Sequence, residues 1–275
     1  MKIRLLIVFA LLTNAALAQD FEGTIKWSMK MDITDPKLKA QMEEAEKKMQ
    51  DPATQAQMKQ AMERMNDPQF KKMMESNPQL KAQMEAMMKN VQAGGSMMPT
   101  GMTMKTKAGN ALTKMEGGPM ANMETLSLKD KNESYVINRD SKTYSVLPHS
   151  ESSVTTTSKE PAVAVKKTTE TQKILNYTCT KTIVTVSENG HTVTQNFWTT
   201  TEIKNLDFRK FADQKVSGKQ AMYYKELDGV PLKIEMTMPQ GTMTLQVTEI
   251  KKETLNASDF QVPAGFTETK MPGQR

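Results

Sequence analysis

The stretch that decides the fold class is residues 24–34, which read Thr-Ile-Lys-Trp-Ser-Met-Lys-Met-Asp-Ile-Thr. Every second residue from Ile25 to Ile33 is apolar, and the residues between them are charged or polar. An apolar period of two predicts a β-strand with one face buried and the other in water. Asp35-Pro36 follows directly. A dipeptide that ends in proline often marks the boundary of a secondary-structure element, so we expect the strand to end there.

The same period returns at Met102 and continues almost to the end of the chain. Short turns such as Asn189-Gly190 and Asp228-Gly229 join successive runs, so neighbouring strands should be antiparallel. A sheet of about ten strands curls or closes. We therefore expect an α+β, mainly β fold, a curved half-barrel sheet with one face apolar throughout. The later strands are predicted at 102–104, 111–115, 123–128, 135–137, 144–147, 164–171, 177–187, 191–200, 220–226, 231–238 and 242–250.

Between the first strand and Met102, residues 35–92 follow a different pattern. Asp or Asn followed by Pro recurs at 35–36, 51–52, 67–68 and 77–78, and a methionine stands seven residues after each Asp or Asn. Asp and Asn cap helix N-termini, and proline is favoured at the first helical position. Each preceding helix should end at the same point, because the residue before a proline avoids the helical region. The pattern predicts three or four short helices, a Met-rich insert after the first strand.

The N-terminal residues 1–18 have the order of a secretory signal: Lys2 and Arg4, an apolar run, then Ala16-Leu17-Ala18. The apolar run is far shorter than a membrane span, and no later stretch is long enough. We expect a periplasmic or secreted protein that does not span the membrane, with residues 19–275 as one half-barrel domain. Residues 148–161 are rich in Ser and Thr and are predicted to form a mobile loop.

The composition excludes several kinds of site. The 275 residues include one Cys and two His, so no disulfide or Cys-based metal centre can form within the chain. Cys179 is either a small buried side chain or a reactive thiol. The sequence has no nucleophile elbow, phosphate loop, His-Glu-x-x-His or dinucleotide fingerprint, so we expect neither an enzyme nor a bound cofactor. Its basic residues form no stripe of the kind that binds nucleic acid.

The 25 methionines, in a chain with only 5% aromatic residues, have three interpretations. They fill a core, they form a deformable surface for a lipid, an acyl chain or an apolar segment of an envelope protein, or their thioethers bind Cu(I). Met102 and Met104 are the pair on which we would test the metal hypothesis. The candidate ligand-binding residues are Trp27, Met29, Met31, Phe70, Met84, Met87, Met88, Met102, Met104, Met236 and Met238.

Six segments recur in order as they do in a known group: 21–25, 98–104, 173–179, 197–200, 229–232 and 259–266, the last reading Asp-Phe-Gln-Val-Pro-Ala-Gly-Phe. Together they resemble a bacterial family of secreted proteins of unknown function, related in fold to the periplasmic lipoprotein carriers (LolA/LolB-like). That resemblance implies a half-barrel whose concave apolar face holds acyl chains under short helices. The Asp-Pro repeats are loosely similar to Met-rich helical modules of co-chaperones, which offer a groove to hydrophobic peptides.

Overall fold

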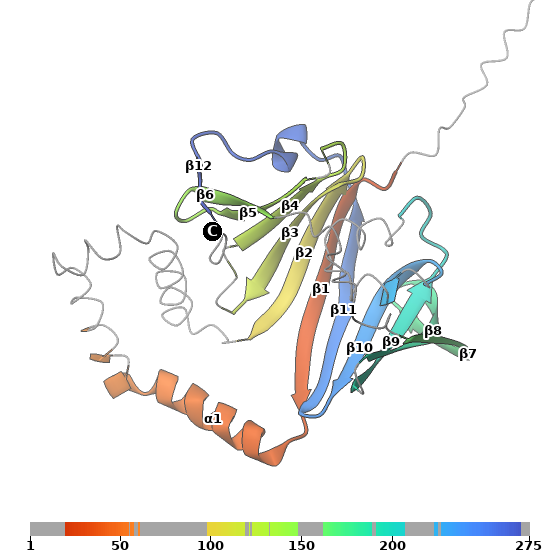
Figure 1. Ribbon diagram of the computed structural model, residues 1–275, viewed down its shortest axis with the longest axis horizontal. Coiled ribbons are helices and arrows are strands. Elements are labelled where there is room, and N and C mark those ends of the chain that lie inside the picture. The colour runs from red at the N-terminus through yellow and green to blue at the C-terminus, as the bar shows by residue number, and fades with distance from the viewer. Residues whose placement is uncertain are drawn as a thin grey trace, which may run out of the picture.

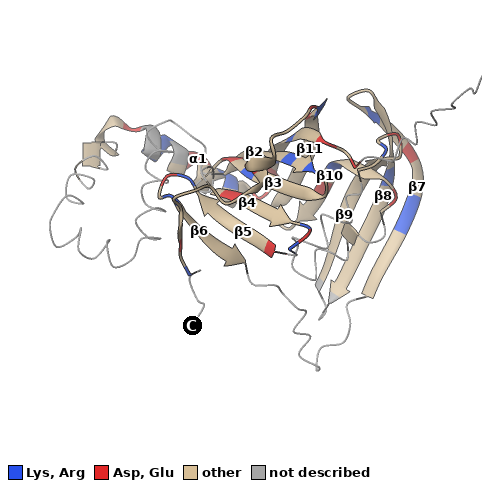
Figure 2. Ribbon diagram, turned by 90° about the horizontal axis from the view of Figure 1, so that it is seen from above, with Lys and Arg blue, Asp and Glu red and all other residues tan. Residues whose placement is uncertain are grey.

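The protein is built around one curved sheet (Figures 1 and 2). The computed structural model describes residues 20–54, 56, 57, 60, 98–118, 121, 123–131, 133–147, 162–188, 191–206, 223, 224 and 227–270. Within these residues the sheet has twelve strands, in the order β12-β6-β5-β4-β3-β2-β1-β11-β10-β9-β8-β7. The strands are β1 (Gly23–Ile33), β2 (Pro99–Lys107), β3 (Asn110–Gly117), β4 (Met123–Leu128), β5 (Glu133–Asn138), β6 (Thr143–Leu147), β7 (Ala162–Ile174), β8 (Tyr177–Glu188), β9 (His191–Thr200), β10 (Val230–Met238), β11 (Gly241–Lys252) and β12 (Thr267–Glu268).

The sheet is antiparallel at every pairing except that of the two-residue β12 with β6. The first strand lies near its centre, because β1 pairs with β2 on one side and with β11 on the other. The predicted fold class, a mainly β protein with a curved antiparallel sheet, is therefore confirmed. The alternation in β1 is also as predicted: Ile25 and Trp27 are buried, and Lys26 and Ser28 are exposed.

The helix that follows β1 is α1 (Pro36–Gln50), and it begins and ends at the predicted Asp-Pro dipeptides. The Asp35 carboxylate accepts hydrogen bonds from the backbone N–H groups of Lys37 at 2.8 Å and Leu38 at 3.1 Å. The cap thus satisfies N–H groups that have no partner within the helix. Asp51 ends α1, and residues 52–54, 56, 57 and 60 are again helical. The later repeats, the signal segment 1–18 and the loop 148–161 lie outside the described residues.

The prediction of one continuous apolar face is wrong, because the apolar side of the sheet changes between β2 and β4. We call the side of Ile25, Trp27, Met29 and Met31 the Trp27 face, and the opposite side the Lys26 face. Leu112 pairs with Lys105, which pairs with Thr24, so Leu112 lies on the Lys26 face. An apolar cluster continues from Leu112 on this face through three more strands and the chain's C-terminal part. Its buried members are Leu112, Leu126, Tyr135, Ile137, Leu255 and Phe260.

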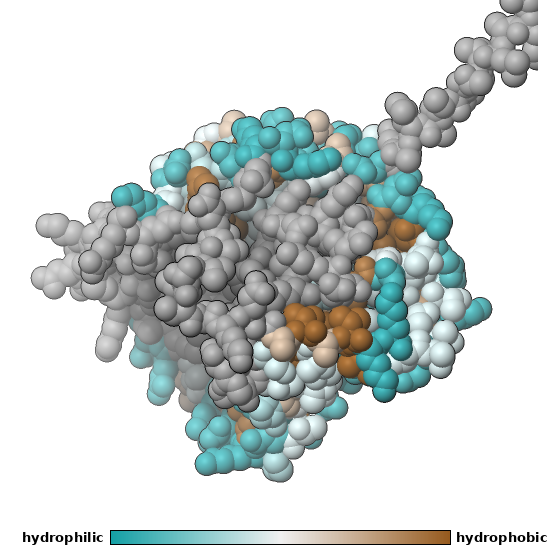
Figure 3. All heavy atoms as spheres, turned by 45° about the vertical axis from the view of Figure 1, so that its right-hand side comes forward, coloured by the Kyte–Doolittle hydropathy of each residue, from teal (hydrophilic) through white to brown (hydrophobic). Residues whose placement is uncertain are grey.

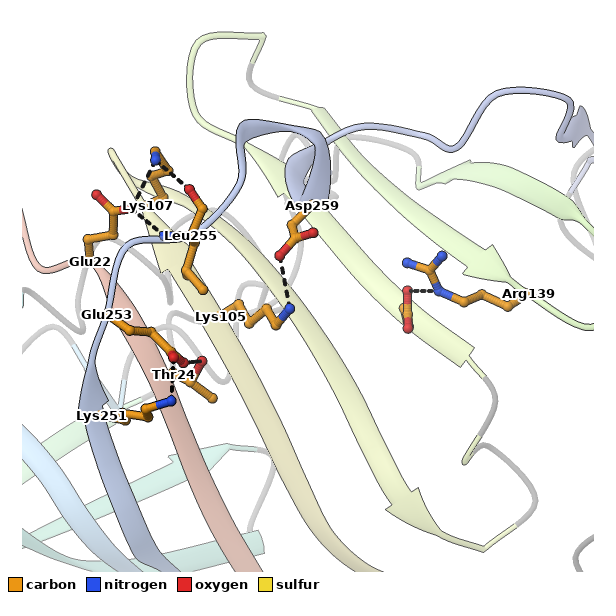
Figure 4. A network of polar contacts seen from close by, with 10 residues as sticks. Glu22, Thr24, Lys105, Lys107, Arg139, Lys251, Glu253, Leu255 and Asp259 are labelled. Carbon is orange, nitrogen blue, oxygen red and sulfur yellow. Dashed lines mark hydrogen bonds and ion pairs between the residues drawn. The ribbon is translucent and has the colours of Figure 1, made fainter.

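The cover of this second cluster is the segment 253–266, here called the C-terminal strap, which contains the short 3-10 helix η1 (Ala257–Phe260). Ion pairs and hydrogen bonds attach the strap to the sheet (Figure 4). Glu22 accepts hydrogen bonds from the Leu255 backbone N–H at 2.6 Å and the Lys107 ammonium at 2.9 Å. The Lys105 ammonium lies 2.9 Å from an oxygen of Asp259. The sheet therefore has apolar cover on both sides, at different strands.

The Trp27 face carries a further apolar cluster over β8–β10. Tyr223 and Tyr224 cover this cluster, and their conformation corrects the prediction of a strand over 220–226. Tyr223 and Tyr224 are helical, so the predicted strand over 220–226 is wrong at these residues. The Tyr224 ring packs edge-on against Phe197 of β9, with 5.6 Å between ring centroids. The Tyr223 hydroxyl donates to the backbone oxygen of Val193 at 3.5 Å. Two consecutive tyrosines that both contact the sheet cannot alternate as a half-buried strand does. The Asp228-Gly229 turn therefore does not join two paired strands.

Candidate functional site

A pocket of about 410 Å³ lies between the end of β1 and the helix α1. The sheet contributes residues of β1, β2 and β11, and α1 contributes a stripe that includes Met42 and Ala45. Both α1 residues are half-buried and lie three positions apart, so they share one face of the helix. The lining residues are Met29, Lys30, Met31, Asp32, Ile33, Lys39, Met42, Glu43, Ala45, Met98, Pro99, Thr100 and Met243. Five of these thirteen are methionines, so the pocket concentrates the residue in which the whole chain is rich.

The sheet register explains why the methionines gather here. Met31 of β1 is paired with Met243 of β11, and Met243 is paired with Met236 of β10. On the other side of β1, the pairing with β2 ends at Ser28 and Gly101, and Met98 precedes β2 and lines the same pocket. Directly opposed residues of adjacent strands lie on the same face, with Cβ atoms about 4.5–5.5 Å apart. The result is a transverse row of three methionines, here called the methionine row: Met31, Met243 and Met236.

Gly241 holds the register that forms the methionine row. A Cβ atom on Gly241 would lie 2.0 Å from the backbone oxygen of Asp32, so no other residue allows β11 to approach β1 so closely here. The turn before β11 also anchors the start of the helix, because the Gln240 oxygen accepts from the backbone N–H groups of Thr34 at 2.9 Å and Asp35 at 3.2 Å. The same turn therefore positions both Met243 and α1 at the pocket.

The methionine row leads to a buried amide. Met236 pairs with Gln195 of β9, which is 5% exposed. Within the described part of the chain, no hydrogen bond to the Gln195 side chain is present, although buried polar side chains nearly always have a partner. The two tyrosines that bind β9 at Val193 and Phe197 flank Gln195 on either side along the strand. An apolar surface thus ends at a group that can both donate and accept a hydrogen bond.

The predicted ligand-binding residues that the structure describes separate into three groups. Met29 and Met31 line the pocket. Trp27 and Met104 are each 4% exposed and belong to the core, and Met102 packs against that same core cluster. Met236 and Met238 are half-buried on β10, next to the pocket-lining Met243 but not among the lining residues. Phe70, Met84, Met87 and Met88 lie outside the described residues. Of the predicted strand methionines Met29, Met31, Met102, Met104, Met236 and Met238, only Met29 and Met31 therefore line the pocket.

Three pocket methionines were missed from the sequence: Met42, Met98 and Met243. A signal for Met243 existed, because it belongs to an alternating strand that a tight turn joins to Met236 and Met238. Met98 precedes the predicted strand by four residues, and only the folded structure shows that it lines the same pocket as Met31. Met42 stands seven residues after Asp35, as in every repeat, and nothing local distinguishes it from its counterparts.

The charges around the pocket balance, with Lys30 and Lys39 against Asp32 and Glu43. Among the described residues, no group of three His, Cys, Asp or Glu side chains converges as a metal site. Cys179 is buried in the core, away from the pocket-lining residues, and burial raises the pKa of its thiol to about 11. A thiol with such a pKa is protonated at neutral pH and unreactive. The interpretation of Cys179 as a small buried side chain is supported.

A second apolar surface lies at the β7 edge of the sheet, on the side shown in Figure 3. Val163 of β7 pairs with Val186, which pairs with Val193 of β9. Val163 and Val193 are each 39% exposed.

No helix within the described ranges is long and apolar enough to cross a membrane.

The sequence profile of a domain of unknown function, DUF4412, matches residues 72–266. The chain belongs to the DUF4412 family. The predicted membership of a family of unknown function is thereby confirmed. The DUF4412 match includes β2 to β11 and the strap, and it begins after β1 and α1, which form part of the pocket. No curated protein matches this DUF4412 chain at a significant level.

Some solved structures resemble this DUF4412 protein in part. One is PNGF-II, with 16% identity over 62% of this chain and a TM-score of 0.33; the match spans only 28% of PNGF-II. The lipoprotein LppX of Mycobacterium tuberculosis matches with 12% identity over 66% of this chain and 98% of its own, with a TM-score of 0.33. A domain from Vibrio parahaemolyticus, provisionally assigned to outer membrane lipoprotein sorting, has 11% identity over 58% of this chain and 80% of its own, with a TM-score of 0.25.

Proposed function

We propose that this protein is a non-enzymatic cell-envelope protein that binds a hydrophobic ligand between its curved sheet and the Met-rich helical insert. The observation that carries the proposal is the pocket of about 410 Å³, in which five methionines, Ile33, Pro99 and Ala45 form an apolar lining. Small-molecule sites generally occupy about 300–1,000 Å³ and are mostly apolar with a few polar groups. The pocket falls in that range.

Methionine is suited to a ligand of variable shape. Its side chain is unbranched, has three rotatable bonds and is polarizable, so a methionine surface can repack around different apolar groups. The five pocket methionines are half-buried, in contrast to Met104, which is part of the core. A side chain that is only half-buried in the ligand-free protein still has apolar area to bury when a ligand binds. An acyl chain or an apolar peptide side chain supplies such area.

The ligand is expected to be an amphiphile with a neutral polar end. Its apolar part would lie along the methionine row, and its polar end would reach Gln195, the next residue of that row. A carboxamide can donate to and accept from a hydroxyl, an ester or an amide. A bare carboxylate would be buried without a positive partner, which is unfavourable. Monoacylglycerols and long-chain alcohols have the required chemistry.

The test is a titration of the purified full-length mature protein with a fluorescent long-chain alcohol, with native mass spectrometry of the same sample. We expect one ligand per chain. Met31→Asp places a carboxylate in the pocket and should weaken binding at least about tenfold. Ser28→Asp is the matched control, because Ser28 is exposed on the Lys26 face of the same strand, and it should bind as the unchanged protein does. A clean ligand-free mass without uptake, or equal affinities of both variants, would contradict the proposal.

A further inference from the structure

The pocket combines five soft thioether donors with only two carboxylates, those of Asp32 and Glu43. Met29, Met31, Met42, Met98 and Met243 bring five thioethers to it from β1, α1, the start of β2 and β11. In the described part of the chain, His, Cys, Asp and Glu side chains form no group of three around a common point. A thioether is a weak ligand for hard cations and a good one for Cu(I). The five thioethers of this pocket therefore favour Cu(I) over hard cations.

The sheet register and the helix α1 bring four of these methionines to one pocket. Adjacent strands lie about 4.7–4.9 Å apart, and Met31 is paired with Met243, so these two side chains are neighbours on the Trp27 face. Met98, just before β2, lines the same pocket. Each methionine side chain has three rotatable bonds and can move its sulfur toward the middle of the pocket. Met42 faces the same space from α1 on the opposite side of the pocket. The side chains of Met31, Met243, Met98 and Met42 can thus bring their sulfurs to a single ion.

From this arrangement we propose that the pocket binds one Cu(I) ion through the thioethers of Met31, Met98 and Met243, with Met42 as the fourth ligand. This site differs from the pair Met102 and Met104 expected from the sequence. Met104 is 4% exposed and paired with Ile25, so an ion reaches it only if the core opens, and Met102 does not line the pocket. The pocket methionines are half-buried and accessible from solvent. The proposal is independent of whether the pocket also takes an apolar ligand.

Methionine-to-leucine variants separate the binding of Cu(I) from the binding of an apolar ligand. Leucine has nearly the volume and the apolar character of methionine, so the exchange preserves packing and an apolar ligand site while it removes the sulfur. The double variant Met31→Leu, Met243→Leu removes the central thioether of the row and one neighbour. Met115→Leu, Met123→Leu is the matched control, because these residues lie on β3 and β4 and do not line the pocket.

The experiment is an anaerobic competition for Cu(I) between the purified full-length mature protein and a chromophoric Cu(I) chelator. We expect the unchanged protein and the control variant to withdraw one equivalent of Cu(I), and the pocket variant to lose at least about tenfold in affinity. Ag(I), a soft ion without redox chemistry under these conditions, should follow the same order when titrated by calorimetry. If the unchanged protein withdraws no Cu(I), or if the pocket variant binds as tightly as the control, the site is wrong.

The fluorescent alcohol is then titrated into the same three proteins. We expect equal affinities for all of them, because the apolar lining is intact in each. A loss of Cu(I) in the pocket variant with unchanged alcohol binding supports a thioether site. A parallel loss of both would show that the pocket has collapsed and would remove the support for sulfur ligation; Met31→Ile, Met243→Ile then repeats the comparison with a second apolar pair. An absence of alcohol binding by the unchanged protein contradicts only the proposed function, because the Cu(I) competition is read without the alcohol.

Discussion

Gln195 is a buried amide in a sheet interior that is otherwise apolar around it. Its neighbours across the sheet are Val184 and Met236, and its neighbours along the same face of the strand are Val193 and Phe197. A buried amide without a partner costs about 1–3 kcal/mol of stability. A position that retains such a group is a candidate for ligand recognition, because a ligand can supply the missing partner.

Gln195→Leu tests this role with two measurements that should move in opposite directions. The free energy of unfolding should rise by about 1–2 kcal/mol, because an amide with no partner among the described residues is replaced by an apolar group of similar size. The affinity for a long-chain alcohol should fall by about 1 kcal/mol or more, since a hydrogen bond to its hydroxyl is lost. Urea unfolding and ligand titration give the two values. A variant that is less stable than the unchanged protein would show that Gln195 has a structural partner instead.

Glu22 makes the attachment of the C-terminal strap depend on pH. The Leu255 N–H and the Lys107 ammonium hold the pKa of the Glu22 carboxyl below its usual value of 4.5. Because the folded pKa is lower than the unfolded one, Glu22 stabilises the fold above about pH 4.5, and this stabilisation is lost as the pH falls through the folded pKa. The carboxyl of Glu253, bound to Lys251 and Thr24, has a lowered pKa for the same kind of reason.

The expected result is a fall in stability below about pH 4.5, smaller in Glu22→Gln than in the unchanged protein. Urea unfolding midpoints, measured from about pH 7 down to about pH 3, give this slope for both proteins. Asp32→Asn serves as a control, because it changes an acidic residue at the far end of β1 from the strap contacts. An equal slope for all three proteins would show that Glu22 does not link the strap to pH.

Among the elements, the sequence predicts the strands well and their shared faces poorly. Strands such as β9 and β11 follow from alternation and Gly-containing turns alone. Alternation fixes which residues of one strand share a side, but it does not reveal which side a neighbouring strand turns toward the core. Ala111 and Leu112 are both buried, one on each face, because Phe21 and its neighbours cover one side and the strap covers the other. That information lies at the two ends of the chain, far from β3.

Phe260→Ala measures how much the strap contributes. Phe260 is 5% exposed in the cluster with Leu126 and Tyr135, and removal of a buried phenylalanine side chain generally costs about 3–5 kcal/mol. We expect the loss of stability in Phe260→Ala to lie near the lower end of this range, since the strap can move away and leave no closed cavity. Hydrogen exchange should accelerate in β4 and β5 and stay unchanged in β8 and β9, which another cluster covers. Uniform acceleration in all strands would instead indicate global unfolding.

The β7 strand is the long unpaired edge of the sheet. Its first part, Ala162–Val165, is apolar and exposed, and charges follow only from Lys166 onward. The pairing with β8 is irregular between Lys167 and Thr171, which protects the later part of the edge from further pairing. We expect Val163→Lys to reduce self-association in concentrated solution without a loss of fold. Sedimentation velocity at increasing concentration measures the self-association, and Lys173→Arg, which keeps the charge, is the control. Equal association of the unchanged protein and both variants would exclude the β7 edge as the cause of self-association.

At the scale of the whole molecule, the methionines are distributed by role. Trp27 and Met104 are held in a core to which segments before β1 and after β9 contribute, whereas Met29 and Met31, farther along β1, leave that core and face α1. The same Met-X-Met pattern therefore has different surroundings at different distances along one sheet. The sequence could predict that two layers meet at methionine-rich surfaces. It could not predict that the turn before Gly241 positions α1 and β11 so that Met29 and Met31 are the strand pair that lines the pocket.

Removal of residues 37–92 tests whether the helical insert serves the pocket or the fold. β1 and β2 are adjacent and antiparallel, so the remaining residues 34–36 and 93–98 can close them as a hairpin loop. The buried residues of β1, Ile25 and Trp27, are covered from elsewhere in the chain. We therefore expect the truncated protein to keep its circular dichroism spectrum and cooperative unfolding. It should lose at least about tenfold in affinity for the alcohol, because α1 supplies Met42 and Ala45 to the pocket. A truncated protein that unfolds or aggregates would show that the insert stabilises the sheet, and one that binds unchanged would place the ligand elsewhere.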